Sequence, residues 1–349
     1  MAIVNLYNQL SHRVDYDLTE QVNNRAKLDT GTHCNYRCGF CYYKTQLNEV
    51  TPFEVIKERI DYLVACGMTE VDLSGGESSI HKEWFAILDY CRSKGLKISC
   101  LSNGYKFADM DFIKKSQQHG LNEILFSVHG YDKESHNELV GHRKGWDNII
   151  QAIKNAHELG MLVRINCTVT NRNYKSLPTK FTELMKELTP WEVNFLTLNY
   201  WNDANVIETI DYAETTPYIH KTIDSLVDII PKINVRYTPY CYMKGYEKYV
   251  CNYYQHIYDV YDWNIAVYNG TVDPEDYKHQ PMKHLYESAK ENRNRTYHKS
   301  RDCTGCKHYY ICDGVEKQIN NFEFKPDVGD KITNPNYYRK SFYASTSTE

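Results

Sequence analysis

Three cysteines near the start of the chain stand at a spacing that suits a metal centre. Cys34, Cys38 and Cys41 form a C-x3-C-x2-C pattern on one short segment that follows a β-like run. Cysteine thiolates hold iron–sulfur clusters. Three of them on a tight loop can bind three irons of a [4Fe–4S] cluster and leave the fourth iron open to another ligand. The alternatives are three core cysteines, or a zinc site completed by His33, because structural zinc takes four ligands.

Five further cysteines lie in the last third of the chain. Cys303, Cys306 and Cys312 have the spacing C-x2-C-x5-C, and Cys241 and Cys251 precede them. Such spacing is typical of metal ligands, with a zinc knuckle as the alternative. Two four-ligand sites cannot be built from five cysteines, so we predict one auxiliary [4Fe–4S] cluster, held by four of them or by fewer with an open iron. The spacing does not say which cysteine is spare. The other four cysteines are expected in the core: Cys66, Cys91, Cys100 and Cys167.

The composition narrows the setting in which these cysteines act. The 349 residues include 41 Lys plus Arg and 45 Asp plus Glu, and the net charge of −4 gives no electrostatic footprint for nucleic acid. No apolar run is long enough to span a membrane, and the first residues lack the pattern of a secretory signal. We therefore expect a cytoplasmic protein. Because the cytosol is reducing, its 12 cysteines are expected to serve metal binding, catalysis or packing rather than disulfides.

The elements that position the first cysteine loop follow from short apolar runs that alternate with helical patterns. In the helical pattern 53–64, for example, Phe53, Ile56 and Ile60 recur at a 3.6-residue period. Strands that alternate with helices favour a parallel sheet. Six β/α units are predicted, with strands 28–33, 71–74, 97–102, 122–128, 161–169 and 192–199 and helices 53–64, 81–94, 109–118, 134–158, 175–188 and 215–230.

The faces of the predicted strands are those of a barrel. In 162–169 apolar residues alternate with polar ones such as Arg164 and Asn166. A barrel strand turns its apolar face to the outer helices, so a polar inner face predicts a lined cavity. Ser127 and His129 end the fourth strand, at the carboxyl end where parallel α/β folds place active sites. The predicted fold class is α/β, a partial (β/α)6 TIM-type barrel followed by a small loop-rich α+β unit.

The character of the sequence changes after the sixth unit. Strand-like pieces at 233–237 and 263–268 lie among loops rich in aromatic residues, and many of the 31 tyrosines are expected to pack there. A loop-rich unit of this size needs an additional stabilising cross-link, and a bound metal can provide one. The predicted organisation is an N-terminal extension (1–27), the barrel (28–231), an auxiliary-cluster domain (232–340) and a disordered tail (341–349).

The first cysteine loop, together with Gly75-Gly76-Glu77 after the second strand, resembles the radical SAM superfamily over about residues 25–230. In that family the cysteines ligate the cluster, and its open iron chelates the amino and carboxylate groups of S-adenosylmethionine (SAM). The resemblance implies that Phe40 lies near the adenine and that Gly-Gly-Glu meets the methionine ammonium. Glycine lets the backbone approach closely, and a carboxylate accepts charge-assisted hydrogen bonds. A proline commonly follows this motif, where this chain has Ser78.

The resemblance implies further SAM contacts at the ends of later strands. Asn103 and Ser127 match polar positions that such enzymes use around SAM. Arg164 faces inward on the fifth strand and is expected to meet the SAM carboxylate. Arg143 is its rival for that role. A structural role is the alternative for each of these four residues.

The second cysteine group resembles the auxiliary-cluster domain called SPASM, or its shortened twitch form. A full SPASM domain continues with a cysteine four residues after Cys312 and another further on. This chain has Glu316 at the first of these positions, and no cysteine follows Cys312.

The resemblance implies a radical reaction. One electron from a donor such as flavodoxin or ferredoxin cleaves SAM reductively, and the resulting 5′-deoxyadenosyl radical abstracts a hydrogen from a substrate carbon. An auxiliary cluster that accepts the electron of the substrate radical favours net oxidation or cross-linking. Candidates for an acid or radical quencher are His129, Tyr240 and Glu316.

The expected substrate is a peptide. The alternative is radical oxidation or epimerisation of a carbohydrate, nucleoside or other small molecule. Peptide-modifying relatives often carry an N-terminal recognition module, and only 33 residues precede Cys34, so a peptide would dock directly or through a separate recognition protein. A hypothesis of another class is a non-enzymatic zinc or iron–sulfur binding or sensor protein.

Overall fold

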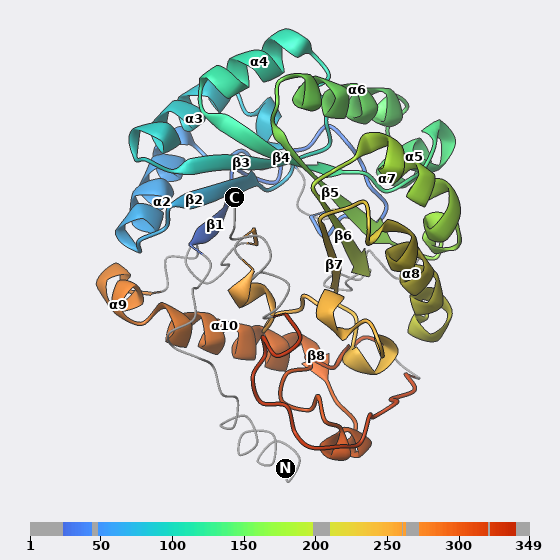
Figure 1. The fold of residues 1–349 in the computed structure, drawn as a ribbon. Helices are drawn as coiled ribbons and strands as arrows, with labels where there is room; N and C mark the ends of the chain where they lie inside the picture. Colours follow the sequence, from blue (N-terminus) through green and yellow to red (C-terminus); the bar gives the residue numbers. More distant parts are fainter. Residues whose placement is uncertain are drawn as a thin grey trace.

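The computed structural model describes residues 24–43, 48–197, 210–259, 261–262, 272–319 and 322–339. Its largest feature is a parallel sheet of seven strands that are hydrogen-bonded in chain order. The sheet curls into an open arc with helices along its outer side (Figure 1). The strands are β1 (Arg25–Asp29), β2 (Glu70–Ser74), β3 (Lys97–Ser102), β4 (Leu121–Ser127), β5 (Leu162–Val169), β6 (Glu192–Thr197) and β7 (Lys232–Arg236).

The helices of the connections bury their apolar faces against the sheet. In the first of them the predicted 3.6-residue period is confirmed, because Ile56, Ile60 and Leu63 are its buried residues. Aspartates at the N-caps of two others, Asp109 and Asp211, accept hydrogen bonds from the first helical N–H groups. The helices are α2 (Phe53–Ala65), α3 (Trp84–Ser93), α4 (Met110–Gln118), α5 (Lys133–Val140), α6 (Gly145–Glu158), α7 (Thr182–Leu188), α8 (Tyr212–Leu226), α9 (Pro274–His279) and α10 (Pro281–Thr296).

The predicted fold class is confirmed, and β7 adds a strand to the six expected units. The first strand covers 25–29 rather than 28–33, because Arg25 and Lys27 are buried although they are charged. The predicted helix 134–158 is two helices, because Gly141 ends α5 in the left-handed conformation at φ 62°. In both places a tertiary contact, rather than the local sequence pattern, determines where the element begins or ends.

The last strand, β7, belongs to the sheet, whereas the predicted domain boundary placed it in the C-terminal unit. It pairs in parallel with β6 over five residues, from Glu192↔Lys232 to Leu196↔Arg236. After it come turns, α9 and α10, and a short antiparallel pair, β8 (Tyr297–His298) and β9 (Val315–Glu316). The predicted strand 263–268 and tail 341–349 lie outside the described residues, as do the first 23 residues of the predicted extension.

The tyrosines of the C-terminal unit pack as the sequence predicts. The buried tyrosines of this unit are Tyr240, Tyr242, Tyr249, Tyr253, Tyr254, Tyr258, Tyr277, Tyr286, Tyr297, Tyr309 and Tyr310.

Among the residues that the structure describes, no helix is both long and apolar enough to cross a membrane.

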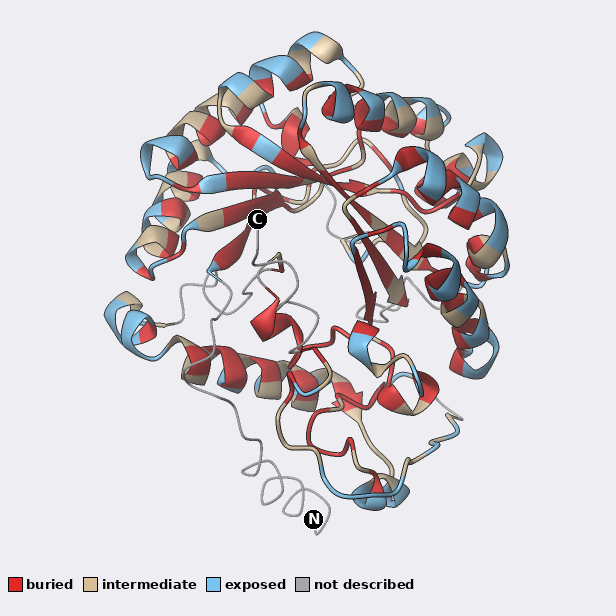
Figure 2. Cartoon of the chain, viewed as in Figure 1, coloured by how far each residue is buried: buried red, intermediate tan, exposed pale blue. Residues whose placement is uncertain are grey.

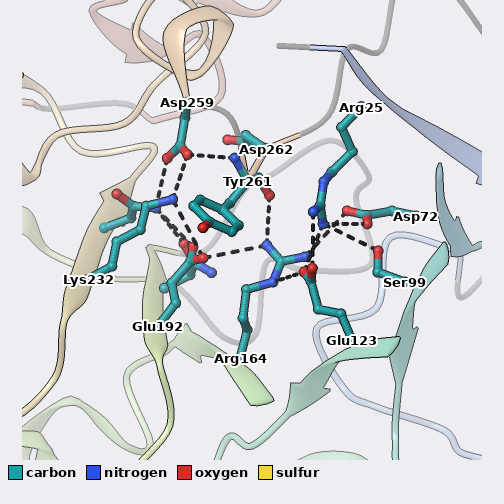
Figure 3. Close-up of polar contacts among 12 residues, drawn as sticks. Arg25, Asp72, Ser99, Glu123, Arg164, Glu192, Lys232, Asp259, Tyr261 and Asp262 are labelled. Atoms are coloured by element: carbon teal, nitrogen blue, oxygen red, sulfur yellow. Dashed lines mark hydrogen bonds and ion pairs between the residues drawn. The ribbon is translucent and has the colours of Figure 1, made fainter. Parts of the chain in front are cut away.

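The strands are buried over most of their length (Figure 2), and the inner face at their amino ends carries opposite charges in contact (Figure 3). Arg25 of β1 pairs with Asp72 at 3.0 Å and with Glu123 at 2.8 Å. Arg164 of β5 also pairs with Glu123. Burial acts to raise the pKa of Glu123, but these two arginines lower it below its ordinary value. The polar inner face is therefore present as predicted, but at this end ion pairs fill it.

Three residues of the C-terminal unit, Asp259, Tyr261 and Asp262, complete this network between the first and last strands. Asp259 accepts from Lys232 of β7 at 2.5 Å and from Arg339 at 3.2 Å. The ring of Tyr261 lies beneath two cations, with Arg25 of β1 at 5.8 Å and Lys232 at 4.8 Å from its centre. Because these contacts reach both edges of the sheet, the C-terminal unit closes the arc at its amino end.

Candidate active site

The cysteine loop leaves the carboxyl end of β1, at the opposite end of the sheet from the charged network. Its middle rests on the carboxyl end of α5 and on Gly141, which follows it. There the N–H of Arg37 donates to the carbonyl of Val140, and the N–H of Gly39 donates to that of Leu139, both at 3.1 Å. A Cβ on Gly141 would lie 2.4 Å from the Arg37 carbonyl oxygen, so glycine is required at this contact.

The thiols of the loop influence one another electrostatically. Burial raises the pKa of Cys34 to about 11 and also raises that of Cys38, and the neighbouring Cys41 raises both further. These effects show that the three thiols lie close together. Three thiolates here would repel one another unless cations lay between them, and the irons of a cluster supply that charge. The donor set fits a three-cysteine cluster.

The Gly-Gly-Glu segment packs directly on the backbone that leads into the cysteine loop. The N–H of Gly76 donates to the carbonyl of Gly31, and the N–H of Glu77 donates to that of His33, both at 2.9 Å. A Cβ on Gly75 would lie 2.1 Å from the Gly31 oxygen, and one on Gly76 would lie 2.0 Å from the His33 oxygen. Only glycine permits this approach, so the two motifs form one unit.

The carboxylate of Glu77 is buried and accepts hydrogen bonds from groups inside the protein. It accepts from the Ser79 hydroxyl at 2.5 Å, the Ser102 hydroxyl at 2.9 Å and the N–H of Asn103 at 2.6 Å. Burial raises the pKa of Glu77, and these hydrogen bonds act in the opposite direction. The backbone N–H of Ser79 also acts on this carboxylate. A carboxylate offers about four acceptor positions, so partners inside the protein already use them.

Asn103 joins the end of β3 to the cysteine loop. Its side-chain nitrogen donates to the Oδ1 of Asn35 at 2.9 Å and lies 3.8 Å from the sulfur of Cys34. Its own Oδ1 accepts the N–H of Tyr105 at 3.0 Å, which fixes the orientation of the amide. The structure therefore brings Asn103 to the edge of the cluster loop, where the predicted SAM contact requires it.

His129 and Phe40 also meet beside the loop. Their ring centres are 4.6 Å apart in an edge-on arrangement. The Nδ1 of His129 accepts the N–H of Thr168 at 3.0 Å, so the proton of the neutral ring is on Nε2. Burial and the nearby His136 lower the pKa of His129 to about 3. Ser127, two residues earlier, is half-buried at the end of β4, opposite Asn166.

The two arginines predicted to compete for the SAM carboxylate lie in different surroundings. Arg164 is buried in the charged network, where its guanidinium pairs with Glu192 at 3.5 Å and donates to the Tyr261 carbonyl at 2.7 Å. These partners, together with Glu123, account for its charge, so we assign Arg164 to the barrel interior. Arg143 is exposed in the α5–α6 turn.

Four of the five C-terminal cysteines form a second group. Burial raises the pKa of Cys241 to about 12, and the charges of Cys312, Cys303 and Cys306 raise it further. The sulfur of Cys312 also accepts the N–H of Gly314 at 3.4 Å. The N–H of Cys306 donates to the carbonyl of Cys303 at 3.0 Å, so these two ligand candidates share one turn. Four neighbouring thiols match the ligand number of a [4Fe–4S] cluster.

Cys251 stands apart from this group. Its thiol is buried and lies 3.8 Å from carboxylate oxygens of Asp259 and Asp262. The ligand atoms of these three residues lie within 4.8 Å of one another, which is compatible with a metal ion. However, Arg339 pairs with Asp259 and Arg236 pairs with Asp262. Arginines already balance both carboxylates, so we read Cys251 as part of the charged network and as the spare cysteine.

The other two candidates for an acid or quencher belong to the C-terminal unit. Tyr240 precedes the first cysteine of the second group, and its buried ring stacks on His308 with centres 4.8 Å apart. Glu316 is buried in β9, where the hydroxyl of Tyr297 donates to it at 3.4 Å. Of the three candidates, only His129 has a described contact with the first cysteine loop.

Sequence reasoning missed several residues that support the site. Ser79 and Ser102 hold the Glu77 carboxylate, and Val140 and Gly141 support the cysteine loop. The available signals were small polar residues around a strand end and a Gly inside a long helical pattern. Neither signal specifies its partner.

Comparisons with known proteins agree with this geometry. Residues 28–177 match the family model of the Radical SAM superfamily. Fe-coproporphyrin III synthase from Methanosarcina barkeri is 28% identical over 161 residues, which are 45% of this chain and 40% of that protein. A probable GTP 3′,8-cyclase from Saccharolobus islandicus is 30% identical over 178 residues, which are 49% of this chain and 56% of that protein. The chain thus spans about half the length of these curated relatives.

Solved structures extend the likeness of the fold beyond the matched residues. Streptococcus suis SuiB bound to precursor peptide SuiA aligns over 87% of this chain and 75% of its own, with a TM-score of 0.60 and 15% identity. Native anSMEcpe with bound AdoMet and Cp18Cys peptide aligns over 92% and 94%, with a TM-score of 0.59 and 17% identity. At such identities the likeness concerns the fold alone.

The matched residues include both the three-cysteine loop and the Gly-Gly-Glu segment that packs against it. That family uses a [4Fe–4S] cluster and SAM, and the thiols and glycines here fit them. Residues 28–177, which carry both motifs, therefore form a domain of the radical SAM type.

Proposed function

We propose that this enzyme oxidises or cross-links a peptide by abstracting a hydrogen atom from one of its carbons. The observation that carries the proposal is the division of the cysteines into a group of three and a neighbouring group of four (Cys241, Cys303, Cys306 and Cys312). Three ligands leave an iron open for SAM. Four ligands close the second cluster, so its role is to pass electrons, which favours net oxidation of the substrate.

The residues of the first site have separate tasks in this reaction. When bound, the cluster supplies the electron that cleaves SAM to methionine and a 5′-deoxyadenosyl radical. Gly75 and Gly76 let the backbone approach the cysteine loop, and Glu77 holds the end of β3. The Gly-Gly-Glu segment as a whole is expected to meet the methionine ammonium. Asn103 is placed for a polar contact with SAM, and Phe40 packs near the adenine.

His129 holds its proton at Nε2 and remains neutral over the physiological range, because its pKa is about 3. It therefore serves as a hydrogen-bond donor beside Phe40 rather than as a proton donor. We propose Tyr240 as the candidate for a later proton or hydrogen transfer, because its hydroxyl is buried with no hydrogen-bond partner in the described part of the chain.

The peptide assignment is supported by the fold neighbours that hold a bound peptide, since they align over most of this chain. A nucleoside or other small molecule is the second candidate, favoured by the names of the curated relatives. We test the substrate class by deuterium transfer. Perdeuterated candidate peptides should give singly deuterated 5′-deoxyadenosine by mass spectrometry, whereas perdeuterated GTP should not. Transfer from GTP alone would reject the peptide assignment.

Cysteine substitutions test the division of labour between the two groups. In anaerobically reconstituted enzyme, Cys38→Ala should abolish reductant-dependent formation of 5′-deoxyadenosine. Cys303→Ala should keep SAM cleavage and lose product, with about four irons fewer per chain because one cluster is lost. Cys251→Ala is the matched control and should keep the iron content of the wild type. A loss of iron in Cys251→Ala equal to that in Cys303→Ala would contradict our assignment, and a fully loaded wild type that makes no 5′-deoxyadenosine would favour a non-enzymatic sensor.

A further inference from the structure

A basic surface patch lies on the solvent side of the first cysteine loop. It consists of Arg37 in the loop itself and Arg143 and Lys144 in the α5–α6 turn, and all three residues are exposed. The chain as a whole is acidic, with a net charge of −4. A cluster of cations on an acidic protein is a local feature that needs its own explanation.

The patch is continuous with the cysteine loop. The end of α5, which leads directly into this turn, accepts the hydrogen bonds of Arg37 and Gly39 already described. An Arg37 guanidinium nitrogen donates to the Cys34 carbonyl at 2.7 Å. His142 of the turn stacks on Tyr36 of the loop, with ring centres 4.2 Å apart. A molecule seated on the patch would therefore be separated from the cysteines by one layer of loop.

The acidic side chains nearest in sequence do not neutralise the patch. On α5, Glu138 pairs with Arg172. On α6, Asp147 pairs with Lys133 at 2.6 Å. Beside the patch, Tyr105 is 42% exposed and 6.3 Å from the ring of His142, which adds an aromatic rim. Arginine and aromatic side chains are enriched in protein interfaces.

We infer that this patch is the docking surface for the electron donor, a small acidic electron-transfer protein with a low-potential one-electron centre. The inference rests on the proposed function, because reductive cleavage of SAM is the step that would need such a partner. The donor is oxidised by one electron, and the site held by the three cysteines is reduced by one. Complementary charge holds the acidic partner where the path to the loop is short, and it also speeds the encounter.

The inference gives Arg143 a role different from contact with the SAM carboxylate. The Cys34 sulfur lies beside Asn103, at the end of β3, whereas Arg143 is exposed on the turn that supports the other part of the loop. The two sides of the loop thus serve different molecules, with SAM at the strand ends and the donor at the turn.

The test compares two reductants on the reconstituted enzyme. We replace Arg143 and Lys144 by glutamate together (R143E/K144E) and leave Arg37 unchanged, because its side chain supports the cluster loop. The matched control is K114E/K154E, two exposed lysines on α4 and α6. Both variants shift the net charge from −4 to −8, and Lys154 is about 15 Å further along the helix than the patch.

The probe is a purified flavodoxin of net negative charge, and reduced methyl viologen serves as the small reductant. At low ionic strength R143E/K144E should lower the flavodoxin-driven rate of 5′-deoxyadenosine formation at least about tenfold, and raise the Kd for flavodoxin similarly. The rate with methyl viologen should stay within about twofold, and the control should match the wild type. Rising salt should slow the wild type toward the variant.

Three outcomes would overturn the inference. The first is an unchanged Kd and flavodoxin-driven rate in R143E/K144E. The second is an equal loss with both reductants, which would assign these residues to SAM or to the cluster. The third is an intact flavodoxin rate with a raised KM for substrate, which would make the patch a substrate surface. The Kd for flavodoxin is measured without SAM cleavage, so its result does not depend on the proposed function. Failure of the proposed function would appear differently, as a wild-type enzyme that forms no 5′-deoxyadenosine with methyl viologen.

Discussion

Gly76 illustrates how strictly single residues are fixed at this site. A Cβ there would lie 2.0 Å from the His33 carbonyl oxygen, which belongs to the backbone just before the first cysteine. Backbone cannot yield as a flexible side chain can. A substitution would therefore push apart the two motifs that the reaction needs together.

We predict that Gly76→Ala lowers the free energy of unfolding by clearly more than Gly160→Ala and also reduces the iron content. Gly160 is the matched control, because it has φ +65° but no heavy atom within 4 Å of an added Cβ. Its substitution should cost only the strain of the left-handed conformation, about 1–2 kcal/mol. Urea unfolding and iron analysis measure both effects, and equal losses in the two variants would contradict the steric argument.

Residue-level prediction from sequence succeeded where a motif is local. The C-x3-C-x2-C loop is visible because its ligands lie within eight residues, and the structure groups its thiols. The partners of Glu77 were not visible, because Ser102 and Asn103 come from the next strand, 25 and 26 residues away. Spacing also could not identify the spare cysteine, since the surroundings of Cys251 depend on Asp259 and Asp262.

At the scale of elements, the inner face of the sheet depends on mutual ion pairing. Arg164 has 1% of its surface exposed and has Glu123 and Glu192 as acidic partners. Both carboxylates come from neighbouring strands. If the guanidinium is lost, their charges remain buried without their principal cation.

We predict that Arg164→Met costs about 3–5 kcal/mol of unfolding free energy, the usual effect of removing one partner from a buried pair. The control is Lys133→Ala, which removes an ion pair with Asp147 whose side chains are 60% and 51% exposed. That substitution should cost at most about 1 kcal/mol. Both values come from urea titrations of the purified protein. A loss below 1 kcal/mol in Arg164→Met would show that the network adds little.

The same network explains which elements the sequence predicted well. Helices on the outer face obey a simple apolar period, so all six β/α units were found. On the inner face, charged residues are buried, against the usual rule that they are exposed. For this reason the sequence placed β1 three residues late. It also assigned β7, which starts at Lys232, to the C-terminal unit instead of the sheet. Pairing of charges across strands is a tertiary property that no window of sequence contains.

On the scale of the whole molecule, buried histidines make stability depend on pH. Burial lowers the pKa of His136 to about 4, and burial together with Arg236 lowers that of His256 to about 3, from an ordinary value of 6.5. In the unfolded chain these rings take up protons below pH 6.5, whereas in the folded protein they stay neutral. The unfolded state therefore binds more protons as the pH falls, and the folded state is disfavoured.

We predict that the free energy of unfolding is constant with respect to these groups above about pH 7 and falls between pH 6.5 and about 4. Each such histidine contributes a slope of about 1.4 kcal/mol per pH unit. His136→Gln should reduce the slope by the contribution of one histidine. His279→Gln should leave the slope unchanged, because the side chain of His279 is 74% exposed. Urea unfolding at pH 7, 6 and 5 measures the slopes. Equal slopes in the two variants would contradict the prediction.

The contacts of Arg339 also bear on how the protein is made. This residue is fully buried and donates to Asp259 and to Asn234 of β7. The ribosome therefore has to deliver 339 residues before the polar interior of the barrel is complete. A nascent chain stopped at residue 231 would end with β6 as an open sheet edge, which is a template for aggregation. We expect the barrel to mature after translation, in step with the C-terminal unit, rather than as a domain that folds first.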